Sequence, residues 1–222
     1  MERTPEPELM VEDHQAQAYA LADFEEAHRR MLEVFDGFFP TLPDTGHAVD
    51  LGCGPGDIAC RFAARYPGWR VDGVDASRVM LGYGPVIAER YPGVATRVAL
   101  VEGLLPHCPV PRERYDVVLS NSLLHHLADP QALWIAVRRL AGPGAPVLIM
   151  DLVRPTANEV VDELVEEYAS GEPEVLRRDF ANSLRAAYRV AEVELQLAQA
   201  RLPWLAVAMV TDRHMVVSGV AS

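Results

Sequence analysis

The sequence predicts an α/β protein in which a mostly parallel sheet has helices on both faces. Short apolar runs alternate with amphipathic stretches between Ala48 and Asp151, as in parallel strands joined by right-handed crossover helices. A cluster of glycines follows the first apolar run directly, and an acidic residue ends the second. Hydrophobic residues make up 50% of the 222 residues and charged residues 23%, which is typical of a globular domain.

The N-terminal region is predicted to be a tail followed by helices. Residues 1–12 contain two prolines and four glutamates, so we expect a flexible tail there. Residues 13–222 form one predicted domain. Within residues 13–46, apolar side chains recur at helical spacing (Phe24, Ala27, Met31, Val34 and Phe38) and predict a short helix followed by a longer one that begins near Asp23.

Five strands and their connecting helices are expected next. The strands are Ala48–Leu51, Arg70–Asp75, Arg97–Val101, Tyr115–Ser120 and Pro146–Asp151. The first helix begins at Asp57, and the second begins after Ser77 as its N-cap and is interrupted near Gly84. The third follows Asp129 and should bury one apolar stripe, made of Leu133, Trp134, Val137 and Leu140.

The C-terminal part contains more helix than one crossover requires. Apolar positions predict two helices in residues 155–190, separated at Ser170-Gly171, and a third around Val193–Leu197. We interpret residues 155–190 as a small helical lid. Two apolar runs, Leu205–Val210 and Met215–Val220, end the chain and predict a pair of strands joined by a hairpin.

The stretch from His47 to Asp57, HAVDLGCGPGD, predicts a ligand-binding turn at the end of a strand. Ligands of parallel sheets bind beyond the carboxyl ends of the strands, and glycine lets the backbone approach them closely. A dinucleotide-binding turn has the spacing Gly-x-Gly-x-x-Gly, but here the third glycine comes one residue early and Asp57 takes its place. A carboxylate there repels a diphosphate, whereas acids at Asp50 and Asp57 suit a cofactor that carries a sulfonium and an ammonium group.

Residues 50–56, DLGCGPG, resemble the glycine-rich first motif of class I S-adenosylmethionine-dependent methyltransferases. The segment VDGVDAS at residues 71–77 supports the resemblance, because its strand ends in Asp75, 23 positions after Gly52, where an acid binds both ribose hydroxyls. An ordinary turn or capping acid is the alternative for Asp75. The resemblance implies S-adenosyl-L-methionine as cofactor and a seven-stranded Rossmann-like sheet with one antiparallel strand. It also implies that residues 13–46 form a helical cap over the cofactor and that the lid lies between strands five and six.

The resemblance also assigns cofactor-binding residues. The amino acid part of the cofactor is expected at the glycine turn, made of Asp50, Gly52, Cys53, Gly54 and Gly56, and the ribose at Asp75. Ala76 and Met80 would pack on the adenosine. The segment LVEG at residues 100–103 resembles the third-strand motif, with Glu102 in place of the usual aspartate and Gly103 after it. The segment DVVLSNSLLHHL at residues 116–127 resembles the fourth motif, in which Asn121 would meet the methionine part. Tyr19 could line the cofactor pocket from the cap or simply pack in the core.

Catalytic candidates are expected at the same edge of the sheet, near the transferred methyl group. His125 and His126 follow the fourth strand, and a neutral imidazole can accept a proton near pH 7. His126 is the preferred general base. Asp151 ends the fifth strand, and Arg213 and His214 lie in the hairpin, where an arginine would suit an acceptor carboxylate or phosphate. A structural role for the histidines and an ordinary polar hairpin are the alternatives.

Charge and cysteine content restrict the partners. The net charge of −12 and the pI near 5.0 disfavour nucleic acid, which generally requires a basic face. The cysteines are Cys53, Cys60 and Cys108, an odd number without a CxxC pair, so no disulfide or zinc framework is indicated. A metal held by His125, His126 and Asp151 has no ligand spacing to support it, and we predict no metal. The acidic N-terminus and the lack of a long apolar run indicate a cytoplasmic protein with no membrane partner.

These observations predict methyl transfer from S-adenosyl-L-methionine to a small-molecule O, N or C acceptor. In-line displacement depends mainly on alignment, which can supply roughly 7–11 kcal/mol of the barrier. Three alternatives remain open: another chemistry of the same cofactor, an NAD-dependent dehydrogenase, and a non-catalytic cofactor-binding protein of methyltransferase type. The sequence leaves the oligomeric state open, including a homodimer.

Overall fold

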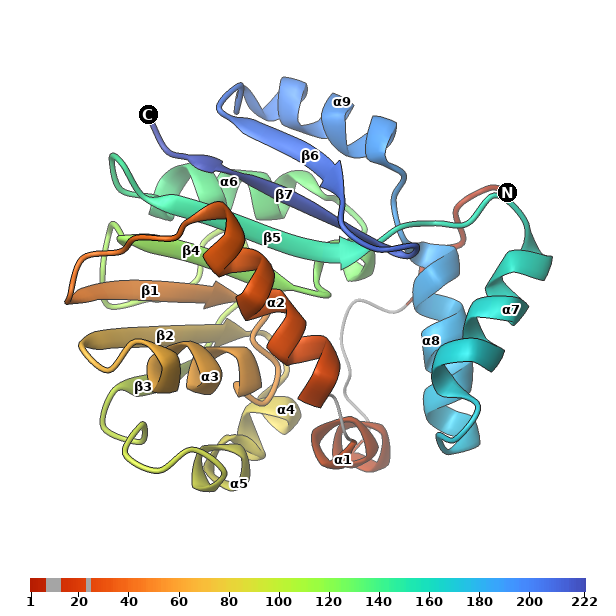
Figure 1. The fold of residues 1–222 in the computed structure, drawn as a ribbon, viewed down its shortest axis with the longest axis horizontal. Coiled ribbons are helices and arrows are strands. Elements are labelled where there is room, and N and C mark those ends of the chain that lie inside the picture. The colour runs from red at the N-terminus through yellow and green to blue at the C-terminus, as the bar shows by residue number, and fades with distance from the viewer. Residues whose placement is uncertain (7–12, 23–24) are drawn as a thin grey trace.

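The computed structural model describes residues 1–6, 13–22 and 25–222, and its centre is a seven-stranded sheet (Figure 1). The strands are β1 (Gly46–Leu51), β2 (Trp69–Asp75), β3 (Val98–Glu102), β4 (Val117–Asn121), β5 (Pro146–Leu152), β6 (Leu205–Met209) and β7 (His214–Val220). Their order is β3-β2-β1-β4-β5-β7-β6, and β7 runs antiparallel to both of its neighbours. The predicted fold class is therefore confirmed, and β6 has the same direction as β1–β5.

The two faces of the sheet carry separate apolar cores because successive strand residues point to opposite sides. In β1, Ala48 packs with α2 (Glu25–Phe38) and α3 (Asp57–Arg65). Its neighbour Val49 packs with α6 (Gln131–Leu140) and α9 (Val190–Ala200) on the other face. Both faces of the sheet are thus covered by helices, as the near-continuous apolar strand sequences require.

Short-range signals set several of the predicted element boundaries. The Ser77 hydroxyl accepts a hydrogen bond from the Met80 amide at 3.2 Å and caps α4 (Arg78–Gly82), and α5 (Gly84–Glu89) begins with Pro85 in its first turn. The Asp129 carboxylate accepts a hydrogen bond from the Gln131 amide at 2.9 Å, at the start of α6. Each cap satisfies an amide that the first helical turn leaves without an intrahelical partner.

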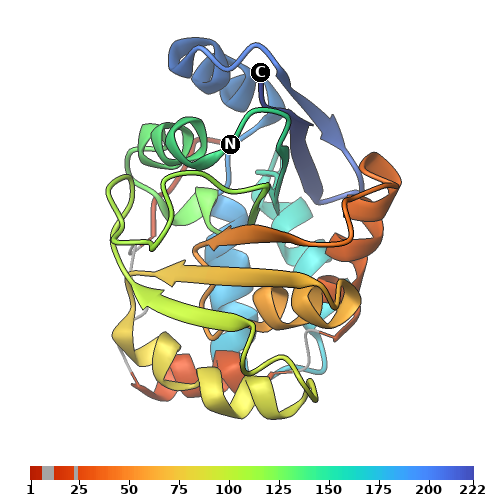
Figure 2. The same cartoon turned by 90° about the vertical axis from the view of Figure 1, so that its left-hand side faces the viewer.

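Two helical units flank the carboxyl edge of the sheet. Helix α1 (Asp13–Leu21) lies beside α4 (Figures 1 and 2). Helices α7 (Asn158–Ala169) and α8 (Glu174–Ala186) pack on each other and have their own apolar cluster, which includes Val161 and Leu184. In Figure 1 this pair stands to the right of the sheet. Among the described residues, no helix is both long and apolar enough to span a bilayer.

Residues 1–6, for which the sequence predicted a flexible tail, make contacts with the region around α7–α9. The N-terminal ammonium donates a hydrogen bond to the Thr156 carbonyl at 2.6 Å. The Arg3 guanidinium donates to the Ala186 carbonyl at 2.5 Å and lies 4.1 Å from the centre of the Tyr188 ring. Composition could not reveal these partners, because they come from the distant α7–α9 region. Residues 7–12 lie outside the described residues, as do Asp23 and Phe24.

We predict that Trp134→Ala lowers the free energy of unfolding by about 3–5 kcal/mol. The Trp134 side chain is fully buried, and its indole N–H donates to the Gln196 side chain of α9 at 3.0 Å. Chemical denaturation would measure the change. The matched control is Leu195→Ala on α9, where the side chain is 65% exposed and a change within about 0.5 kcal/mol is expected. Equal effects of the two substitutions would contradict the assignment of Trp134 to the core.

Candidate functional site

The glycine turn lies over the carboxyl end of β2 and has a conformation that favours glycine. The amides of Gly52 and Cys53 both donate to the Val74 carbonyl, at 2.8 and 3.0 Å. Gly52, Gly54 and Gly56 all have positive φ angles, 71°, 54° and 89°, which L side chains rarely adopt. A Cβ atom at Gly52 would also lie 2.6 Å from Leu123 in the segment after β4. The turn therefore depends on glycine for its backbone shape and for its approach to the β4 segment.

Asp50 is a buried acid directly before this turn. Its side chain is 1% exposed, and neither carboxylate oxygen has a hydrogen-bond partner of normal geometry in the described part of the chain. Burial, together with the nearby charge of Asp75, raises the pKa of Asp50 to about 7, although the Ala59 amide partly opposes the shift. A positively charged group placed beside Asp50 would stabilise its ionised form.

Asp75 ends β2 and faces the same turn. One carboxylate oxygen accepts a hydrogen bond from the Gly54 amide at 2.8 Å, and the other accepts from the Ser77 amide at 2.7 Å. Burial raises the pKa of Asp75, while these amides oppose the shift. The Ala76 amide also acts on this carboxylate, which has about four lone-pair sites in all and so keeps capacity to accept a hydroxyl hydrogen. Asp75 therefore serves as a turn acid, the alternative role expected from the sequence, and is also oriented for a diol.

Other predicted cofactor residues surround these two acids. Ala76 is half-buried, and the methyl carbon of the buried Met80 lies 3.2 Å from the Cβ position of Gly54. Tyr19 lies near the acids. Burial and then the charges of Asp57, Asp75 and Asp50 raise the pKa of Tyr19 to about 12. Cys53 packs toward β2, where a Cβ at Gly73 would lie 2.9 Å from its sulfur. Burial raises the pKa of the Cys53 thiol, so only the backbone of Cys53 is suited to ligand contact.

The predicted adenine and methionine positions also lie at this edge. Glu102 is the partner of Asp75 in the register of β3 and β2, and its exposed carboxylate lies 3.2 Å from the Arg78 guanidinium. The Gly103 amide donates to the Asp75 carbonyl at 2.9 Å. Asn121 ends β4, and the next residue, Ser122, has a φ of 55°. A left-handed serine costs conformational energy, so the turn that places Asn121 is held by its surroundings.

Asp57 does not have the role that the sequence suggested. Its carboxylate binds His28 at 2.6 Å, Arg61 at 2.5 Å and the Tyr91 hydroxyl at 2.7 Å. These bonds outweigh burial and lower the pKa of Asp57. The neighbouring Arg61 also compensates its charge. Asp57 therefore joins α2 and α3 to the segment that follows α5, and the acids that remain for a positively charged cofactor are Asp50 and Asp75.

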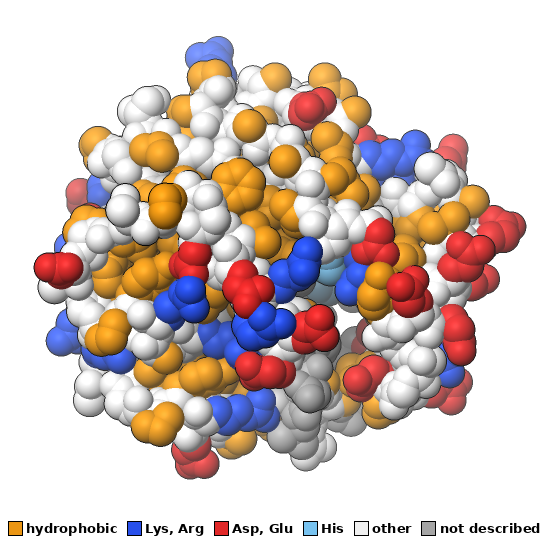
Figure 3. All heavy atoms as spheres, viewed as in Figure 1, with side chains coloured by type: hydrophobic (Ala, Val, Ile, Leu, Met, Phe, Trp, Pro, Cys, Tyr) orange, Lys and Arg blue, Asp and Glu red, His pale blue; other side chains and the backbone are white. Residues whose placement is uncertain are grey.

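A pocket of about 330 Å³ lies beside this network. It is lined by Tyr19, Ala20, Ala22, Glu25, His28, Pro55, Asp57, Arg61, Ile87, Arg90 and Tyr91. Because Pro55 belongs to the glycine turn and Tyr19 to α1, the pocket adjoins the predicted cofactor region. Figure 3 shows acidic and basic side chains gathered near a hollow in which histidine atoms are visible.

His125 belongs to a buried histidine–aspartate pair at the ends of β4 and β5. It lies in a short 3₁₀ helix, η1 (Leu124–His126), and its Nδ1 is 2.6 Å from a carboxylate oxygen of Asp151. The amides of Leu124 and Leu152 also donate to Asp151, both at 2.7 Å. Burial lowers the pKa of His125, but the Asp151 charge outweighs it and the net shift is upward. Asp151 therefore orients His125 and is itself shielded from small molecules.

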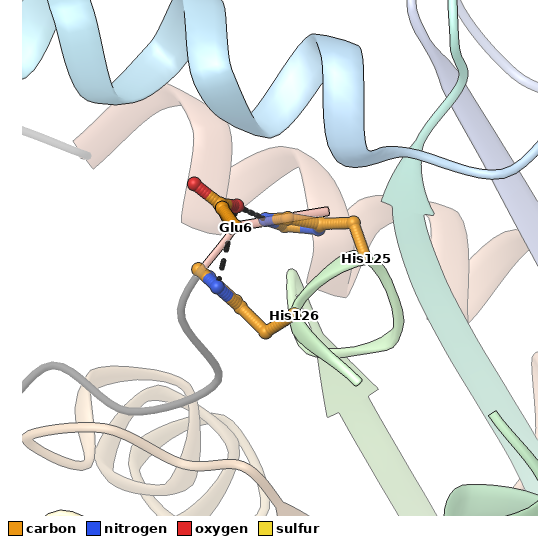
Figure 4. Close-up of side chains that lie close together, drawn as sticks. All are labelled: Glu6, His125 and His126. Carbon is orange, nitrogen blue, oxygen red and sulfur yellow. Dashed lines mark ion pairs between the residues drawn. The ribbon is translucent and has the colours of Figure 1, made fainter. Parts of the chain in front are cut away.

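His126 is the more accessible of the two histidines. Its side chain is 27% exposed, and its Nδ1 lies 3.3 Å from the Glu6 carboxylate. The same Glu6 oxygen is 3.6 Å from Nε2 of His125 (Figure 4). The Ser183 hydroxyl of α8 donates to it at 3.0 Å. Sequence reasoning missed Glu6 and Ser183, because neither is near a motif and only folding brings them to η1.

Arg213 and His214 reach the carboxyl edge but have partners within the protein. The Arg213 guanidinium lies 3.2 Å from the centre of the Tyr168 ring and 2.8 Å from Asp212, and the Tyr168 hydroxyl donates to Asp212 at 2.8 Å. Nδ1 of His214 is 2.9 Å from the Thr211 hydroxyl, and burial followed by the Arg213 charge lowers its pKa to about 4. The hairpin therefore holds α7, and His214 is neutral at pH 7.

Comparisons with known proteins agree with this geometry. A family model described as a methyltransferase domain matches residues 49–147. The trans-aconitate 2-methyltransferase of Methylobacterium nodulans is 32% identical over 146 residues, which cover 66% of this chain and 50% of that protein. The ubiquinone biosynthesis O-methyltransferase of Yersinia pestis is 30% identical over 123 residues, covering 54% and 48%. The chain spans about half the length of these curated relatives.

Solved structures share the fold at low sequence identity. A SAM-dependent methyltransferase from Aquifex aeolicus superposes with a TM-score of 0.67 and 18% identity, covering 96% of this chain and 100% of the other. The plantazolicin methyltransferase BpumL, solved in complex with a triazolic desmethylPZN analog and SAH, gives a TM-score of 0.69 at 11% identity, covering 94% of this chain and 90% of the other. These similarities establish the arrangement of strands and helices.

We predict that Asp50→Asn stabilises the ligand-free protein at pH 8. A pKa raised to about 7 means that folded Asp50 keeps its proton above the pH at which unfolded Asp50 loses it. This residue's contribution to stability therefore falls as the pH rises from about 4 to 7, and the asparagine variant escapes that loss. The expected gain at pH 8 is about 1–4 kcal/mol, since one pKa unit is worth about 1.4 kcal/mol.

Chemical denaturation of both proteins at pH 8 and pH 5 would measure this gain. At pH 5 the difference between them should shrink. Asp44→Asn changes an exposed aspartate and serves as the control. A gain that is the same at both pH values would argue against a raised pKa at Asp50.

Proposed function

We propose that the chain is a member of the class I S-adenosylmethionine-dependent methyltransferase family and that it transfers the methyl group of S-adenosyl-L-methionine to a small-molecule acceptor. The observation that carries this proposal is the pair of acids, Asp50 and Asp75, at a glycine turn between the ends of β1 and β2. The cofactor would supply a methyl group on a positively charged sulfur.

The protein residues would bind and orient that cofactor. The buried Asp50, whose oxygens have no hydrogen-bond partner of normal geometry among the described residues, would attract its positive charges. Asp75 would accept hydrogen bonds from the ribose hydroxyls while keeping those from Gly54 and Ser77. Glycines at 52, 54 and 56 leave room for the ligand to approach the backbone. Glu102, with Gly103 beside it, would lie next to the adenine, and Asn121 next to the methionine part.

The acceptor would bind on the side of η1 and the α7–α8 pair. His126 would orient it or remove its proton, because this imidazole is partly exposed and the buried His125 is committed to Asp151. His214, whose lowered pKa keeps it neutral at pH 7, lies at the same edge. The pairing of Arg213 with Asp212 and Tyr168 favours a role in holding α7 as part of a lid over the acceptor.

A small-molecule acceptor is supported by the names of the relatives. They are named for trans-aconitate methylation, ubiquinone biosynthesis and tocopherol methylation. We expect no nucleic acid partner, because the net charge of −12 disfavours binding to a phosphate backbone. A cytoplasmic location and a homodimer are parts of the same proposal. The acceptor atom is left as O, N or C.

We predict that Asp75→Ala weakens cofactor binding by about 1–3 kcal/mol, or roughly 5- to 150-fold in Kd, through lost hydrogen bonds to a charged group. Isothermal titration with S-adenosylmethionine and its demethylated product would measure the change. Asp44→Asn should bind like the wild type. Wild-type affinity in Asp75→Ala would remove that residue from the ribose site, and NAD binding without S-adenosylmethionine binding would favour a dehydrogenase.

We expect His126→Ala to slow turnover while the cofactor affinity stays nearly constant. A general base contributes about 10²- to 10⁴-fold, so kcat should fall within that range if the acceptor holds a proton. Formation of the demethylated cofactor, followed with a panel of small carboxylate, phenol and amine acceptors, provides the assay. The control is His107→Ala, because His107 is exposed and lies outside η1. Unchanged turnover in His126→Ala would show that this imidazole takes no part in the reaction.

A further inference from the structure

Three potential metal ligands converge beside η1. They are a carboxylate oxygen of Glu6, Nε2 of His125 and Nδ1 of His126, and all three atoms lie within 4.8 Å of one another (Figure 4). The Glu6 oxygen is 3.6 Å from the His125 nitrogen and 3.3 Å from the His126 nitrogen. Two ligands bound tetrahedrally to one Zn²⁺ at about 2.0–2.2 Å are roughly 3.3–3.6 Å apart. Both separations that involve Glu6 match that spacing.

The second nitrogen of His125 has the partner that metal-bound histidines usually have. Nδ1 lies 2.6 Å from Asp151, which two backbone amides hold in place. A histidine that binds metal through one nitrogen commonly donates its other N–H to a carboxylate, and this bond fixes both the tautomer and the ring orientation. When Nδ1–H donates a hydrogen bond to Asp151, Nε2 carries the lone pair of the neutral ring. This nitrogen lies 3.6 Å from the Glu6 carboxylate.

Glu6 is held in position by a contact of its own carboxylate and by contacts of Arg3 on the same segment. The Ser183 hydroxyl donates to its carboxylate at 3.0 Å. The Arg3 guanidinium, on the same segment, donates to the carbonyls of His125 and Leu127 at 2.9 and 3.3 Å. Hydrogen bonds thus connect the N-terminal segment to η1 and to the residue after it. The Glu6 side chain is only 12% exposed.

The charges of this cluster also suit a dication. Glu6 and Asp151 contribute two negative charges beside two imidazoles, which are uncharged when they act as metal ligands. A divalent ion would therefore bring the group to neutrality. Buried ions that are not compensated in this way are strongly destabilising.

We propose that Glu6, His125 and His126 form a binding site for a divalent ion of the zinc class, with Asp151 as the outer partner of His125. Two imidazoles and one carboxylate suit Zn²⁺ or Co²⁺ better than Mg²⁺ or Ca²⁺, which prefer oxygen ligands. Three protein ligands leave one coordination position for water or an oxygen of a small molecule. From the sequence we predicted no metal, after weighing His125, His126 and Asp151 as a ligand set. In the structure the carboxylate near both histidine ligand atoms is that of Glu6.

The test uses the full chain, freed of metal by chelation and dialysis. Titration with Zn²⁺ by calorimetry should show one ion per chain, and Co²⁺ should give the intense visible absorption of a tetrahedral site. Glu6→Gln and His126→Ala should each weaken binding at least tenfold, and Asp151→Asn about 10- to 100-fold. Glu2→Gln and His107→Ala are the matched controls, because both side chains are exposed and should leave binding unchanged.

Either of two outcomes would contradict the proposed metal site. Wild-type protein that binds no Zn²⁺, or Glu6→Gln and His126→Ala variants that bind it like the controls, would make the cluster a network of ion pairs only. Glu6 and His126 decide the question if Asp151→Asn does not fold, since both side chains are partly exposed. The metal-binding test is independent of the proposed function, because binding is measured without S-adenosylmethionine or an acceptor. With Nδ1 of His126 bound to the ion, Nε2 carries the proton, so this imidazole then orients the acceptor and does not remove its proton.

Discussion

The site depends on two carboxylates that the fold holds close together beside a glycine turn. Asp50 is buried without a hydrogen-bond partner of normal geometry in the described residues, and Asp75 adds a second negative charge. Like charges in such surroundings raise the pKa of the carboxyl groups and cost stability. The arrangement makes chemical sense if a positively charged ligand offsets that cost, and a sulfonium cofactor provides the charge.

The same turn explains how the sheet determines the site. The positive φ angles of Gly52, Gly54 and Gly56 bend the chain from β1 over β2, and the amide of Gly54 then binds Asp75. Leu123 from the β4 segment packs where a side chain at position 52 would lie. The loops after β1, β2 and β4 therefore contact one another, and the candidate cofactor-binding groups of three strands lie together at one edge of the sheet.

The opposite end of this edge is organised around a second carboxylate, Asp151. It orients His125 through Nδ1, and the N-terminal segment brings Glu6 to the other nitrogen of the same buried ring. Asp57 illustrates how such pairing changes the meaning of an acid. In the sequence it adjoins the glycine turn, but His28, Arg61 and Tyr91 bind its oxygens, so its charge serves helix packing.

The sequence by itself determined the fold class, the order of elements and the glycine turn with Asp50 and Asp75, because periodicity, glycine conformation and capping are properties of neighbouring residues. It also placed the breaks at Gly84 and Ser170-Gly171 correctly. Only the tertiary structure decided that Asp57 is paired, that Asp151 supports His125 and that residues 1–6 pack against η1 and α8. Those outcomes depend on contacts between segments far apart in the chain, and no local pattern records which partner a charged side chain will meet.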